Sequence, residues 1–219
     1  MAGGSITIDG GVRLAWAHPA EFDRARALRL LGPAERVRAA ATERADQRDR
    51  FLLGRLLVRD LAADAGGIGP EDVNVTATCE RCGREHSRPR VSWPAAVGPP
   101  PSVSLASCDG LVVVALAPAA VAVGVDVERS RATTSRTAEA ERRGAVTDLV
   151  GGSRRTAIRR WVRAEAVLKA DGRGLRVEPA AVVFADGRAH LADRPIDFLI
   201  IDRRIAGCLV SVAVGSVPH

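Results

Sequence analysis

The residues best suited to chemistry lie at the end of one apolar run and on one later helical pattern. The segment 124–128 reads Gly-Val-Asp-Val-Glu and ends an apolar, strand-like run. Residues two apart on a strand face the same side, so Asp126 and Glu128 converge. Further along, Glu165 and Lys169 are four residues apart, which places them along one stripe of a helix. These side chains offer three carboxylates and one ammonium group.

Such a set suits a divalent cation that bridges protein and phosphate. Carboxylates repel one another unless a cation or proton lies between them. Mg²⁺ prefers hard oxygen ligands and takes one or two protein carboxylates together with substrate phosphates and water. Taken separately, the motifs have plainer explanations: a strand that ends in solvent, and a surface ion pair between Glu165 and Lys169. We therefore base the prediction on their combination.

The lysine itself is unusual in this chain. Of the 32 basic side chains, Lys169 is the only lysine, and the others are arginines. Lysine is a compact point charge, whereas arginine is a rigid planar fork, so the two are not equivalent beside a phosphate. A lone lysine in an arginine-rich composition indicates a position where arginine does not serve.

Helical and strand patterns alternate along the chain and must position these residues. Apolar periodicity predicts helices over 21–31, 34–65 and 154–170, the last ended by an Asp-Gly pair. Strands are predicted over the segments 72–77, 103–106, 111–116, 121–127, 181–184, 198–201 and 206–214. Pro118 separates 111–116 from 121–127 and predicts a hairpin between them.

This order indicates an α+β fold with two halves. The proline-rich segment 94–101 predicts a boundary, with an N-terminal half over 1–102 and a C-terminal half over 103–219. A chain of 219 residues, 47% of them hydrophobic, can build cores of this size.

Composition narrows the class of partner. The formal net charge of +6 favours an acidic partner. Aromatic residues are not interleaved with the basic ones, which argues against nucleic acid. No apolar stretch reaches about 20 residues and no signal sequence is visible, so we expect no membrane span and a cytoplasmic protein. Its four cysteines are then expected to be reduced.

Several motifs together resemble a known family. The Gly-Val-Asp-Val-Glu segment precedes residues 161–175, which read Trp-Val-Arg-Ala-Glu-Ala-Val-Leu-Lys-Ala-Asp-Gly-Arg-Gly-Leu. Residues 79–89 read Cys-Glu-Arg-Cys-Gly-Arg-Glu-His-Ser-Arg-Pro, and residues 50–59 form a similar N-terminal helix motif. In order and spacing, these segments resemble the 4′-phosphopantetheinyl transferases of the surfactin-synthetase-activating type.

The resemblance implies two similar α+β halves related by a pseudo-twofold axis, with coenzyme A and Mg²⁺ in the cleft between them. It implies a monomeric enzyme that transfers the phosphopantetheine arm to a serine of an apo acyl or peptidyl carrier protein. The implied metal ligands are Asp126, Glu128 and Glu165. The implied catalytic residues are Glu165 and Lys169, with Lys169 also contacting the pyrophosphate. The implied coenzyme contacts further include Arg38, Arg50, Arg88, Pro89 and Ser107.

Two positions depart from the family pattern. Ser107 stands where the family has a histidine that contacts phosphate, and a hydroxyl carries no charge. Ala164 stands where many members have lysine. The departures leave the acidic residues and Lys169 intact, so an active enzyme is the first interpretation; they are the main support for the alternative, a coenzyme A-binding homologue that does not catalyse transfer. A metal-dependent nuclease using Asp126 and Glu128 is a third interpretation, although it leaves the Gly-x-Gly segment after Lys169 unexplained.

A separate cysteine motif offers an alternative metal site. Cys79, Cys82 and His86 have spacing that resembles half of a zinc site. A closed site needs a fourth ligand from the remaining cysteines or histidines. The other interpretation is a turn with small thiols beside Arg88.

Overall fold

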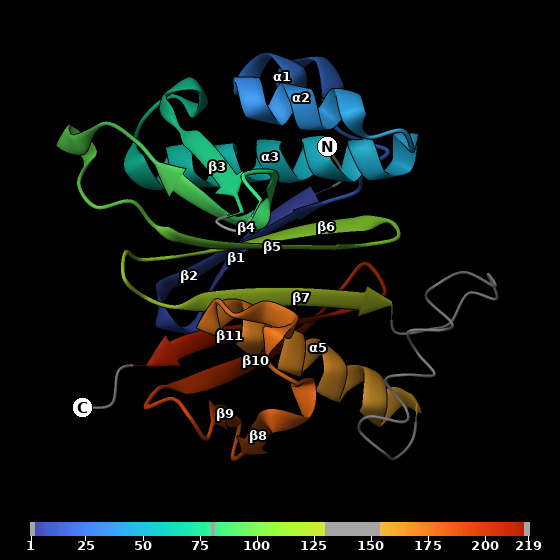
Figure 1. Ribbon diagram of the computed structural model, residues 1–219, viewed down its shortest axis with the longest axis vertical. Helices are drawn as coiled ribbons and strands as arrows, with labels where there is room; N and C mark the ends of the chain where they lie inside the picture. Colours follow the sequence, from blue (N-terminus) through green and yellow to red (C-terminus); the bar gives the residue numbers. More distant parts are fainter. Residues whose placement is uncertain (1–2, 80–81, 130–153, 217–219) are drawn as a thin grey trace. The chain divides into compact units, whose positions relative to one another are not determined.

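The computed structural model describes residues 3–79, 82–129 and 154–216 and has an α+β fold. Packing divides the chain into two compact units, residues 1–121 and 122–219. The described residues form three antiparallel sheets and four helices, shown in Figure 1. The α+β prediction is therefore confirmed.

The first unit contains two of the sheets and three of the helices. Its strands are β1 (Gly3–Ile8), β2 (Val12–Ala17), β3 (Asn74–Thr78), β4 (Glu85–Ser92), β5 (Ser102–Cys108) and β6 (Leu111–Ala117). Its helices are α1 (Arg24–Leu30), α2 (Pro33–Ala41) and α3 (Ala45–Gly66). The main sheet has the order β1-β2-β6-β5, and β3 pairs with β4 in a separate ribbon.

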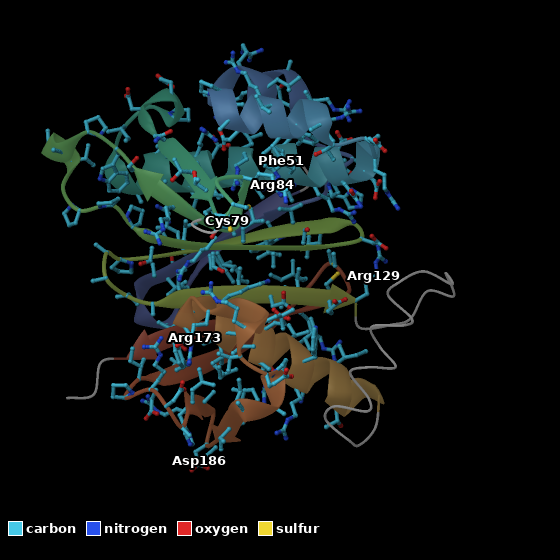
Figure 2. All side chains as sticks on the ribbon, viewed as in Figure 1. Phe51, Cys79, Arg84, Arg129, Arg173 and Asp186 are labelled. Atoms are coloured by element: carbon cyan, nitrogen blue, oxygen red, sulfur yellow. The ribbon has the colours of Figure 1, made fainter. Side chains whose placement is uncertain are left out.

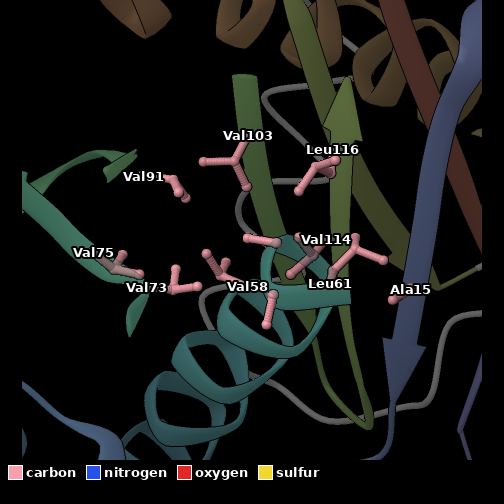
Figure 3. Close-up of a cluster of buried hydrophobic side chains, with 11 residues drawn as sticks. Ala15, Val58, Leu61, Val73, Val75, Val91, Val103, Val114 and Leu116 are labelled. Carbon is pink, nitrogen blue, oxygen red and sulfur yellow. The ribbon is translucent and has the colours of Figure 1, made fainter. Parts of the chain in front are cut away.

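Helix α3 lies between the main sheet and the α1–α2 pair (Figure 1). The core on its sheet side joins Val58 and Leu61 of α3 to Val114 of β6 and Val75 of β3 (Figure 3). Every residue of β6 is buried, and the strand lies between β2 and β5 in the sheet. This packing explains why residues 111–117 read as an uninterrupted apolar run.

Helix α2 is held on α3 partly by charge. Its one large aliphatic side chain, Val37, is 71% exposed, whereas Glu35 is buried. The Glu35 carboxylate lies 2.9 Å from Arg55 and 2.6 Å from Arg59, and both arginines are also buried. The same carboxylate accepts a hydrogen bond from the backbone N–H of Gly32. One buried anion thus joins two helices.

The second unit is a sheet covered on one face by a helix. Its strands are β7 (Val123–Arg129), β8 (Val182–Ala185), β9 (Arg188–Leu191), β10 (Asp197–Ile205) and β11 (Cys208–Ser216). The sheet order is β7-β11-β10-β9-β8. Helix α5 (Arg154–Asp171) packs chiefly against β7 and β11. The core between helix and sheet combines Val167 and Leu168 with Phe198.

Two sequence predictions were wrong. The predicted helix over 34–65 is two helices, because Thr42 has an extended backbone and its hydroxyl donates to the Arg38 carbonyl. The predicted hairpin between 111–116 and 121–127 does not form. Strand β6 pairs with β5 and β2, and β7 pairs with β11 in the other sheet.

The predicted boundary after residue 102 differs from the division into compact units. Strands β5 and β6 follow that residue and pair within the first unit. The proposed functional halves remain a prediction. No helix among the described residues is long and apolar enough to cross a bilayer.

Candidate functional site

Gly124 allows strand β7 and helix α5 to come into close contact. A Cβ atom at this position would lie 1.9 Å from the backbone oxygen of Ala166 and 2.5 Å from the backbone nitrogen of Ala170. Only glycine permits this approach, because both neighbours are main-chain atoms. The side of β7 that carries Gly124 therefore faces α5. Asp126 and Glu128 occupy the same side by strand alternation.

Lys169 binds the strand at its central acidic residue. Its Nζ lies 2.6 Å from Oδ1 of Asp126 and donates a second hydrogen bond to the Val125 carbonyl at 3.2 Å. Asp126 is buried and Lys169 is half-buried. An ion pair with this degree of burial is screened less by solvent than a surface pair. The structure thus brings together two residues that are 43 positions apart.

Glu165 lies within the electrostatic reach of this pair. Burial raises the pKa of the Glu165 carboxyl above its usual range, the Asp126 charge raises it further, and Lys169 opposes the shift. The charge of Asp126 therefore acts on Glu165 as a like charge, which disfavours the ionised form of the Glu165 carboxyl. A raised pKa also makes a carboxylate a stronger base at neutral pH.

Hard oxygen donors of this kind fit Mg²⁺. Asp126 and Glu165 would supply the two carboxylates that such an ion usually takes from a protein, and this ligand role stays a prediction. A cation beside Glu165 would oppose both burial, the main cause of its raised pKa, and the charge of Asp126. Among the described residues, no three His, Cys, Asp or Glu side chains converge as a metal cluster. The third predicted ligand, Glu128, is half-buried on the same face of β7 and stays a prediction.

The residues predicted to contact coenzyme A from the N-terminal part of the chain lie in the first unit. Arg38 lies over the ring of Phe51, with 4.6 Å between its guanidinium carbon and the ring centroid; Figure 2 labels Phe51 on α3. Arg50 forms ion pairs with Asp46 at 3.0 Å and with Asp109 at 2.8 Å. An anion at Arg50 would therefore compete with two carboxylates.

Arg88 differs from these two because its charge is poorly solvated. Burial lowers the pKa of its guanidinium, and the neighbouring Arg90 lowers it further. Its Nε donates to the Val103 carbonyl at 3.1 Å, which fixes the side chain against β5. Pro89 follows it on β4 and is half-buried, while Ser107 is exposed near the end of β5.

The two residues that depart from the pattern of the phosphopantetheinyl transferases have different structural surroundings. Ser107 lies on the surface, where its hydroxyl is accessible. Ala164 is 1% exposed and packs in the core between α5 and its sheet. A lysine at position 164 would have to replace that core contact.

The sequence analysis did not predict one polar network, which lies beside the Lys169–Asp126 ion pair. Asp202 of β10 accepts a hydrogen bond from the Ser211 hydroxyl at 2.7 Å and binds Arg163 of α5 at 2.8 Å. A serine inside the apolar run of β11 was the visible signal. Arg163 is therefore held by Asp202, on the flank of α5 that faces β10.

The cysteine motif forms a turn. The backbone N–H groups of Cys82 and Gly83 both donate to the Cys79 carbonyl, and Gly83 has a φ of 69°. Cys79, labelled in Figure 2, is half-buried and Cys82 is exposed. The His86 side chain lies outside the described part of the structure, as do residues 80–81. Zinc binding by this motif stays a prediction.

A small cavity of about 200 Å³ lies at the β8–β9 turn. It is lined by residues 184–188, Arg163 and Ile200, and Figure 2 labels Asp186 at this turn. None of the predicted site residues lines it.

Comparison with known proteins leaves the chain unassigned. No protein-family model matches it, and no curated protein matches it.

Proposed function

We propose that this chain transfers the 4′-phosphopantetheine arm of coenzyme A to a serine hydroxyl of an apo carrier protein, in a Mg²⁺-dependent reaction. The main supporting observation is the contact of Lys169 with Asp126 beside Glu165, whose pKa is raised. The resemblance of the motifs around these residues to phosphopantetheinyl transferases gives the contact its chemical meaning.

Each residue of this group has a distinct role in the proposal. Asp126, Glu128 and Glu165 hold the metal, which when bound neutralises charge on the pyrophosphate of coenzyme A. Lys169 contacts pyrophosphate oxygens, because its ammonium group is a compact point charge. In the structure this group is paired with Asp126, and the pyrophosphate would replace part of that contact.

Glu165 is the proposed general base. Burial and the Asp126 charge raise its pKa, which increases its affinity for the proton of the carrier's serine. Phosphoryl transfer otherwise depends mainly on positioning and on charge stabilisation. The close contact between β7 and α5 at Gly124 supports such positioning.

The coenzyme contacts proposed in the first unit are Arg38, Arg50, Arg88, Pro89 and Ser107. Arg88 is the strongest of these, because a partly desolvated guanidinium is stabilised by a phosphate. The proposal also includes two similar halves related by a pseudo-twofold axis. Each unit has an antiparallel sheet with a long helix packed against it, which supports this relation.

The proposed enzyme acts in the cytoplasm as a monomer on a fatty-acid, polyketide or nonribosomal-peptide carrier. Its net charge of +6 suits an acidic carrier protein rather than nucleic acid or a membrane.

Intact-mass measurement of carrier proteins tests the transfer. The purified chain is incubated with coenzyme A, Mg²⁺ and a panel of apo carriers from the three classes. We expect at least one carrier to gain the mass of the arm. Glu165→Gln should lower the rate by roughly 10²–10⁴-fold, the usual contribution of a general base.

A matched variant, Glu178→Gln, controls for the loss of a glutamate, because Glu178 is exposed and lies outside the proposed site. It should retain the wild-type rate. The alternative is a coenzyme A-binding homologue without catalysis. Coenzyme binding measured by calorimetry, with every carrier left unmodified, would favour that alternative, and absence of both would reject the proposal.

A further inference from the structure

A row of three polar residues crosses the sheet of the second unit beneath helix α5. In the strand register, Asp126 of β7 pairs with Ser211 of β11, and Ser211 pairs with Asp202 of β10. Directly paired residues face the same side of a sheet. That side faces α5, because Gly124 on the same face of β7 meets the helix backbone. Two carboxylates thus lie at the ends of the row, with a fully buried hydroxyl between them.

Helix α5 binds both ends of this row. Lys169 meets Asp126 at 2.6 Å on one flank. Arg163 meets Asp202 on the other, with contacts of 2.8 Å from one terminal nitrogen and 3.1 Å from Nε. The two cations are six positions apart, which places them about 120° apart around the helix and about 9 Å apart along it. The ion pairs of Lys169 and Arg163 therefore straddle the helix, and Arg159 adds a weaker contact of 3.8 Å with Asp202.

The contact between the helix and the sheet is closest where small residues meet, and larger apolar side chains of α5 such as Val162 and Leu168 pack around that point. At its closest point the contact joins Gly124 to the main chain of Ala166 and Ala170, and neighbouring Ala213 is equally small. Small residues allow close approach but provide few interlocking side chains. The ion pairs on the two flanks add to this packing and oppose rotation about the helix axis from both sides.

A small rotation would be enough to disturb the site. Side-chain tips lie about 5–6 Å from a helix axis, so a rotation of about 15° moves them by about 1.5 Å. That displacement would break the contact between Lys169 and Asp126. A misplacement of about 1 Å can lower a catalytic rate about 10²-fold.

We propose that Asp202 and Ser211 are positioning residues that hold helix α5, through Arg163, in the rotation that brings Lys169 and Glu165 to Asp126. The Ser211 hydroxyl donates to one oxygen of Asp202 and so fixes the carboxylate that receives Arg163. The catalytic part of this inference rests on the proposed transferase function. The energetic coupling between the two ion pairs is independent of that function.

A double-mutant cycle tests that coupling without any assay of activity. Arg163→Gln, Asp126→Asn and the double variant are compared with the wild type by urea unfolding. Distant, independent sites add, so their unfolding constants multiply to within about twofold. We expect the double variant to depart from this product by more than about fivefold, although Arg163 and Asp126 bind different partners.

A matched cycle controls for loss of an arginine. Arg176→Gln replaces Arg163→Gln, since Arg176 is an exposed arginine of the same unit that bonds to the Gly172 carbonyl. This control cycle should be additive. Additivity in the Arg163 cycle as well would overturn the proposal. If Arg163→Gln does not fold, Ser211→Ala takes its place in the cycle and is judged by the same criterion.

Kinetics then separate positioning from loss of stability. With a carrier that accepts the arm, Asp202→Asn should lower kcat about 10–100-fold and change the KM for coenzyme A by less than about threefold. Arg163→Lys, which keeps a cation for Asp202, should recover part of the kcat lost in Arg163→Gln. Equal activity of Arg163→Lys and Arg163→Gln would reject the positioning role. Absence of transfer by the wild type would reject the proposed function and leave the result of the unfolding cycle standing.

Discussion

Replacing Gly124 by alanine tests the closest contact in the candidate site. The added Cβ would lie 1.9 Å from the Ala166 oxygen, whereas a carbon–oxygen contact is normally no shorter than about 3.3 Å. Strand and helix would have to separate by about 1.4 Å. Both neighbouring atoms belong to the main chain, so no side-chain rearrangement relieves the clash.

We expect Gly124→Ala to lower the free energy of unfolding by about 3 kcal/mol, the upper end of the usual range for overpacking. In a chain of this length that corresponds to a fall in Tm of about 6–12 °C. The same separation would stretch the Lys169–Asp126 contact from 2.6 Å toward the limit of an ion pair. Urea unfolding and thermal melting, both followed by circular dichroism, measure the effect.

Gly54→Ala is the matched control. Its Cβ would lie 2.6 Å from the end of the Leu105 side chain, which can change rotamer at a cost of about 0.5–1.5 kcal/mol. Alanine also gains about 1 kcal/mol of helix propensity over glycine inside α3. We expect the control to lie within about 1 kcal/mol of the wild type. If Gly124→Ala is as stable as this control, α5 does not lie against β7 as described.

Three further predictions concern buried charge, pH and magnesium. Glu35→Gln leaves two buried arginines without their anion and should cost about 3–5 kcal/mol in urea unfolding, and a loss below about 1 kcal/mol would contradict the charge-held docking of α2. Burial and then the Asp126 charge raise the Glu165 pKa, so the Glu165 contribution to stability is present below the ordinary glutamate pKa and is lost as pH rises through the folded pKa. Stability should therefore fall across that window in the wild type, and Glu165→Gln should flatten the fall; an unchanged pH dependence would refute this assignment. Mg²⁺ at ten times its dissociation constant should stabilise the wild type by about 1.4 kcal/mol in thermal melting, and an equal shift in Glu165→Gln would place the ion elsewhere.

The sequence predicted much of the local structure because local patterns encode it. The helix over 154–170 and the strand ending in Asp126 and Glu128 follow from periodicity and from the Asp-Gly stop. Their strand and helix spacings were enough to group the acids on one face and Glu165 with Lys169 on one stripe.

The sequence did not allow us to predict strand pairing or the break between two helices. Residues 121–127 were assigned to a hairpin with 111–116, yet β7 pairs with β11, which is distant in the chain. Nothing local distinguishes these partners, because both are apolar strands of suitable length. The break between α2 and α3 occurs at Thr42, whose hydroxyl donates to the Arg38 carbonyl, and this bond does not alter the periodicity.

The sequence by itself determined which residue types could act together: three carboxylates and the only lysine of the chain, at spacings set by a strand and a helix. Only the tertiary structure decided that Lys169 reaches Asp126 and that Arg163 is held by Asp202 on the opposite flank. The physical reason is that Gly124 allows the backbone of α5 to contact strand β7 closely. Contacts between residues so far apart in the chain depend on this packing, and local sequence patterns do not encode it.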